Sequence, residues 1–175
     1  MGGFDKSICD CCVCPMQCVL EQLIGVEVDV DTPISGPTTT ITGVKDFIMS
    51  TSDAGDIPVC QITHVEIDDP TNTIITSVLS TLKPIRISNG ECACCEDPMT
   101  NLLKSEVGNN IRIEFINGSF TDELLGVGEG IVVGFDIDIL DIYSTCAITR
   151  VIPETQQQIN DPSRPSRRTT SPPTT

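Results

Sequence analysis

Ten cysteines carry the chemistry that can be inferred from residue type and spacing in this chain. Thiols can pair as disulfides, or four of them can bind zinc as a tetrahedron of thiolates. Most of these cysteines fall in two clusters. The first cluster is CDCCVCPMQCVLEQLIG, from Cys9 to Gly25, and the second is CACCEDPMTNLLKSEVG, from Cys92 to Gly108.

The two clusters align without a gap and share three cysteines, a Pro-Met pair, a leucine and the final glycine, and a second match lies further along the chain. There, CQITHV, which begins at Cys60, matches CAITRV, which begins at Cys146. Matches at both ends of a segment predict two tandem repeats of one structural unit. The equivalent cysteines, all candidates for cross-linking or metal binding, are Cys9 and Cys92, Cys11 and Cys94, Cys12 and Cys95, and Cys60 and Cys146.

Three interpretations of the thiols stay open. Disulfides suit the crowding, because adjacent cysteines point to different partners, one of them within the repeat, such as Cys60, and one in a second chain. Cys14 and Cys18 have no counterpart in the second cluster, so intermolecular disulfides are predicted for them. The second interpretation is one zinc site of four cysteines per repeat, and the third is a set of reduced, buried thiols. The zinc ligands in the second repeat would be Cys92, Cys94, Cys95 and Cys146.

A short helix at the start of each repeat must position the clustered cysteines. Pro15 and Pro98 suit a first helical position, and Gly25 and Gly108 suit a left-handed helix stop. Asp97 is predicted to cap the second helix. The apolar residues that form one face of the first helix are Met16, Val19, Leu20 and Leu23.

After each helix, apolar and polar residues alternate with the period of a half-buried strand. Asn117-Gly118 predicts a hairpin turn with positive φ at both central residues. A helix followed by antiparallel strands predicts a mainly β fold with short helices, built as two tandem helix-plus-small-β-barrel repeats of SH3-like or Sm-like type. Strands are predicted at residues 26–31, 39–49, 59–67, 74–79, 85–88, 111–115, 130–140 and 143–152.

The predicted domains follow from these repeats and from composition. An N-terminal arm covers residues 1–8, and the first repeat covers 9–68. A connection over 69–90 contains strands that could complete the first barrel, and the second repeat covers 91–153. Residues 154–175 are polar and rich in proline, so a disordered tail is predicted there.

Composition excludes several classes of function. A net charge of −15 opposes binding to nucleic acid or to anionic membrane surfaces. No apolar run reaches the length of a membrane helix, and MGGFDKSICDCC lacks the features of a signal peptide. There is no acid–base pair or cofactor loop, so we expect neither an enzyme nor a cofactor. His64, the single histidine, lies on a predicted alternating strand as an exposed residue.

The segments ICDCCVCPMQCVLEQLIG and ECACCEDPMTNLLKSEVG resemble small cysteine-rich proteins of the endospore surface in Bacillus and its relatives. The resemblance implies a coat or exosporium protein of the sporulating cell, made in the mother-cell cytoplasm without a signal peptide and cross-linked later. We therefore expect a non-enzymatic structural subunit of a disulfide-cross-linked surface layer or filament. It would self-associate as a homo-oligomer and contact other surface proteins. The alternative is an intracellular zinc-binding interaction module.

Overall fold

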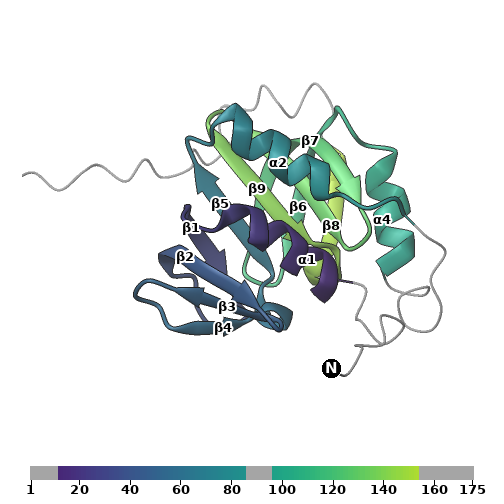
Figure 1. The fold of residues 1–175 in the computed structure, drawn as a ribbon. Coiled ribbons are helices and arrows are strands. Elements are labelled where there is room, and N and C mark those ends of the chain that lie inside the picture. The colour runs from purple at the N-terminus through teal and green to yellow at the C-terminus, as the bar shows by residue number, and fades with distance from the viewer. Residues whose placement is uncertain (1–11, 86–95, 154–175) are drawn as a thin grey trace, which may run out of the picture.

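The computed structural model describes residues 12–85 and 96–153, which fold mainly into antiparallel β-strands with short helices, as predicted (Figure 1). The first part of the chain consists of α1 (Val13–Leu20), η1 (Glu21–Leu23), β1 (Glu27–Asp31), β2 (Thr38–Lys45), β3 (Ile48–Thr51), β4 (Asp56–Pro58), η2 (Val59–Gln61) and β5 (His64–Asp68). The connecting helix is α2 (Asn72–Thr81). The second part consists of α4 (Glu96–Lys104), β6 (Asn110–Phe115), β7 (Gly118–Gly128), β8 (Ile131–Asp136), β9 (Ile139–Ser144), η3 (Thr145–Ala147) and β10 (Ile148–Pro153).

One continuous sheet contains all ten of these strands, in the order β10-β6-β7-β8-β9-β5-β1-β2-β3-β4. In the first half β5 pairs with β1, and in the second half β10 pairs with β6. The second neighbour of β5 is β9 of the other half rather than β4, so the sheet stays open within the described ranges. Closed small barrels are therefore not confirmed, and β10 and β4 are the two edges of the sheet.

The hydrophobic core joins the two halves. The predicted apolar face of the first helix is buried, including Met16 and Leu20. It packs in one cluster with Val65 of β5 and with Val133 and Ile142 of the second half. A second cluster, around Ile113, lies within the second half alone. In Figure 1, α1 and α2 lie together over the middle of the sheet, while α4 lies near β7 and β8.

Residues 74–79, predicted as a strand, are part of helix α2 instead. Thr71 caps this helix by accepting a hydrogen bond from the Ile74 N–H at 3.3 Å. Val78 is buried, and Ile74, Ile75 and Leu79 also pack on the first core cluster, so the apolar residues recur at helical rather than strand spacing. Among the described residues, no helix is long and apolar enough to cross a membrane.

The predicted turns and helix ends are partly confirmed. Gly25 and Gly108 have φ of 88° and 86°, as expected for left-handed stops. Asp97 lies inside α4, which begins one residue earlier, so the predicted cap is displaced. The β6–β7 hairpin forms, but Asn117 does not adopt positive φ, because Gly118 already pairs with Phe115 in the ladder.

The remaining predicted strands need smaller corrections. Two of the long ones, 39–49 and 130–140, each contain a hairpin turn and divide into two strands. The segment 59–67 begins with a 3-10 turn, and 143–152 is interrupted by one. Residue 85 lies outside any strand, and 86–88 lie outside the described residues. The predicted arm and tail also lie outside the described residues.

Gly134 of β8 offers a test of how tightly the second half is packed. A Cβ at this position would lie 2.7 Å from the Cβ of Asp122, a buried residue that accepts a hydrogen bond from the Tyr143 hydroxyl. We expect Gly134→Ala to lower the free energy of unfolding by about 1–3 kcal/mol in urea denaturation. The control is Gly43→Ala on β2, where no atom lies within 4 Å. Equal losses in both variants would contradict this prediction.

Candidate functional site

The contact between β5 and β9 holds the two halves together. It runs antiparallel from His64, opposite Tyr143, to Asp68, opposite Ile139. The pairing extends one residue before β5, where the Ser144 N–H at the end of β9 donates to the Thr63 carbonyl at 3.1 Å. We call this contact the junction.

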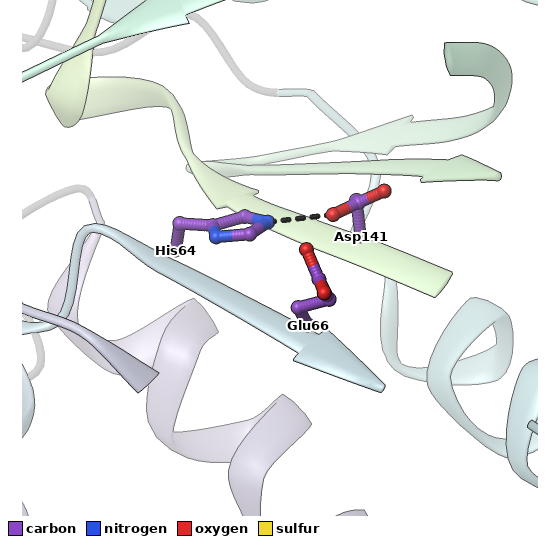
Figure 2. A group of neighbouring side chains, drawn as sticks. All are labelled: His64, Glu66 and Asp141. Atoms are coloured by element: carbon purple, nitrogen blue, oxygen red, sulfur yellow. Dashed lines mark hydrogen bonds and ion pairs between the residues drawn. The ribbon is translucent and has the colours of Figure 1, made fainter. Parts of the chain in front are cut away.

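His64 is the polar centre of the junction. Its Nε2 lies 2.8 Å from an oxygen of Asp141 on β9, as Figure 2 shows, and its Nδ1 lies 3.0 Å from an oxygen of Asp31 on β1. The side chains of His64 and Asp141 are 1% and 0% exposed. Because Asp31 and Asp141 belong to different halves, His64 links the halves through one buried hydrogen-bonded group.

The surroundings of His64 favour its charged form. Burial alone lowers the pKa of His64, but the hydrogen bonds and negative charges of Asp141 and Asp31 outweigh it and raise this pKa to about 9. His64 is therefore an imidazolium at neutral pH, so the junction contains a buried ion pair.

Aromatic rings of the second half surround the imidazolium. Tyr143 stacks on it with ring centroids 4.7 Å apart, and Phe115 and Phe120 lie at 5.0 and 5.2 Å. A cation is attracted to the faces of such rings when water is excluded. The second half thus provides both a carboxylate and an aromatic wall for a side chain of the first.

A metal ion has one candidate place within the described ranges, formed by His64, Glu66 and Asp141, whose ligand atoms lie within 4.8 Å of one another. Figure 2 shows Glu66 on the same strand as His64, with Asp141 opposite. A metal needs a neutral imidazole nitrogen. Both His64 nitrogens already contact carboxylates, so metal binding here competes with a proton and with the ion pair.

A disulfide joins the two halves near one end of the junction. Cys12, just before α1, bonds to Cys146 on η3. The Cys12 sulfur also accepts from the Cys146 N–H at 3.2 Å and lies 3.4 Å from the Thr145 hydroxyl. That hydroxyl donates to Glu96 of α4 at 3.3 Å. Burial raises the pKa of Glu96.

The other predicted cysteines have different environments. Cys14 is also disulfide-bonded, whereas Cys18 is a half-buried free thiol. Cys60 is a free, exposed thiol and borders a cleft of about 50 Å³ together with Cys12 and Cys146. The candidates that lie outside the described residues are Cys9, Cys11, Cys92, Cys94 and Cys95.

Two features of the site differ from the sequence predictions. Cys12 bonds to Cys146 of the other half of the same chain, whereas the expected partners were a cysteine within the repeat, such as Cys60, or one in a second chain. His64 is buried rather than exposed, because the rings of Phe115, Phe120 and Tyr143 of the second half pack against it. In the sequence, Asp141 lies between the apolar residues Leu140 and Ile142. This was the one available signal in the sequence that its carboxylate is buried and needs a partner.

Comparisons with protein-family models, curated proteins and solved structures find no match to this chain.

Proposed function

We propose that this protein is a non-enzymatic structural subunit that self-associates and is cross-linked by disulfides. The observation that carries the proposal is the junction, where two halves with the same order of elements join edge to edge and are bonded by Cys12–Cys146. A chain that already joins two such units in this way has the surfaces needed to join more of them. We further propose that the halves are two copies of one Sm-like unit, each with its last strand on its first.

The chemistry of the junction supports a structural role. The buried imidazolium is 1% exposed, so a substrate has no route to His64 as a general base. The net charge of −15 keeps unassembled chains apart in solution. The Cys12–Cys146 disulfide favours an oxidising environment, and a released spore surface is the one that we propose.

The zinc-binding module is the weaker candidate. Its site in the second repeat would need Cys146 as a thiolate, and this sulfur is bonded to Cys12. Zinc would therefore compete with the disulfide that joins the halves.

Native mass spectrometry before and after reductant tests the proposed function. We expect covalent multimers from the oxidised full-length chain that fall to lower mass once dithiothreitol is added. The mass also reports bound metal directly. A chain that carries two zinc ions, without disulfides and without multimers, would contradict the structural role and support the zinc module.

A further inference from the structure

The sheet ends in two unlike edges, β10 and β4. We infer that a second copy of this chain adds head to tail, with β10 of one chain pairing with β4 of the next, in the manner of the internal junction. This inference rests on the proposed function and names the surfaces through which the subunit assembles.

Each edge strand has a counterpart inside the junction, β5 for β10 and β9 for β4. β5 and β10 are the last strands of the two halves, and each pairs with the first strand of its own half. The likeness extends to side chains. His64 contacts Asp31 at 3.0 Å in the first half, and Arg150 contacts Glu114 at 3.2 Å in the second. β10 therefore has the same place in the second half as β5 has in the first.

The other edge follows the same rule. β9 is followed by η3, which carries Cys146, and β4 is followed by η2, which carries Cys60. Inside the chain, the junction pairs β5 with β9. Their counterparts, β10 and β4, are left as the two edges of the sheet. These edges differ from each other, and contact between them is heterologous, which gives a closed ring or an open filament.

The backbone at β4 is oriented for such pairing. In an antiparallel ladder, alternate residues direct both backbone groups to the same neighbour. Ile57 pairs with Met49, and the next bond runs from the Val59 N–H to the Phe47 carbonyl at 2.9 Å, so Ile57 faces β3. Asp56 therefore directs its N–H and carbonyl toward the open edge.

The backbone at β10 is oriented in the same way. Its register pairs Arg150 with Glu114 and Ile152 with Arg112. The Leu124 N–H donates to the Asn109 carbonyl, so Asn109 faces β7. Every second residue after it, including Ile113 on β6, also directs its backbone groups to β7. Arg150 and Ile152 consequently face β6, and Val151 faces outward.

Charge also favours this pairing. The β4 edge and the turn before it carry Asp53 and Asp56, both exposed, and β10 carries Arg150 with 63% of its side chain exposed. The contact is shorter than the junction, because β4 has only three residues. Pro58 also has no N–H where Ser144 donates one in the junction. Such a contact forms reversibly, and a covalent bond is needed to make it permanent.

Cys60 is the thiol placed to form that bond, since it directly follows the β4 edge and is exposed. Its partner is a thiol of the neighbouring chain, which peptide mapping of the cross-link identifies. Bond formation removes two protons and two electrons from the two thiols. A low-molecular-weight disulfide such as oxidised glutathione accepts them and becomes two thiols.

The non-covalent step is tested with the full-length chain in reductant, by sedimentation velocity over a range of concentrations. Asp56→Pro removes one outward N–H, and we expect it to weaken association about tenfold. Asp56→Ala is the matched control, because it keeps the N–H and should retain most of the association. Val151→Pro tests the opposite edge, and circular dichroism checks that each variant folds. Association of both proline variants at the wild-type level would overturn the inference.

The covalent step is tested in oxidised glutathione on a non-reducing gel, with peptide mapping of the cross-link. We expect Cys60→Ser to abolish the multimers. Contrary to the sequence prediction for Cys18, we expect Cys18→Ser to leave them unchanged, because this thiol is half-buried whereas Cys60 is exposed. Multimers that persist in Cys60→Ser would overturn the inference while leaving the proposed function intact. A chain that stays monomeric in both reductant and oxidant would overturn both.

Discussion

Replacement of His64 with leucine is expected to lower the free energy of unfolding by about 3–5 kcal/mol at pH 7. The substitution leaves the Asp141 carboxylate, which is 0% exposed, without the imidazolium that neutralises it. Chemical denaturation monitored by circular dichroism measures the loss. The matched control is Arg150→Leu, which removes the equivalent ion pair at an exposed position of the second half. Arg150→Leu should lower the free energy of unfolding by no more than about 1 kcal/mol.

The same residue predicts how stability depends on pH. The pKa of His64 is raised from 6.5 to about 9 in the folded protein, so the folded state binds the proton more tightly than the unfolded state. Its contribution is complete below pH 6.5 and is lost as the pH rises through 9. We expect wild-type stability to fall by about 3 kcal/mol across this interval, and His64→Leu to lack this part of the decline. Parallel pH profiles would show that His64 is not the titrating group.

Removal of the Cys12–Cys146 disulfide is the second large effect. The bond closes a loop with a sequence separation of 134 residues, for which chain entropy predicts a stabilisation of about 5 kcal/mol. The Cys12→Ser, Cys146→Ser double variant should therefore unfold at much lower urea concentration under non-reducing conditions.

Cys18→Ser serves as the control for the disulfide variant, because it removes a half-buried thiol that is not bonded. The free energy of unfolding of Cys18→Ser should stay within about 1 kcal/mol of that of wild type. A double variant with the urea midpoint of wild type would mean that the junction holds the halves together without the covalent bond.

Local signals in the sequence predicted the local parts of this fold. The buried face of Met16 and Leu20 followed from helical spacing, and the stops at Gly25 and Gly108 followed from glycine chemistry. Helix α2 was missed because Ile74, Ile75, Val78 and Leu79 in a short apolar run fit a strand as well as a helix. Only the packing of this segment against core residues of both halves distinguishes a helix from a strand here.

The site could not be predicted because its parts are far apart in the sequence. His64 and Asp141 meet only when β5 pairs with β9, and period-two alternation cannot say which strand lies beside which. The same holds for Cys12 and Cys146, because the sequence suggested partners within one repeat or in a second chain, and not in the other half of the same chain.

The position of the Cys12–Cys146 bond also determines how the molecule responds to mechanical force. The bond spans nearly all of the described chain, from the residue before α1 to η3. Tension applied to the chain on either side of these two cysteines passes through the sulfur–sulfur bond, and strands β1 to β9 between them carry little of the load. Stretching such a subunit would peel away β10, the only strand beyond the bond among the described residues, while the enclosed sheet keeps its length.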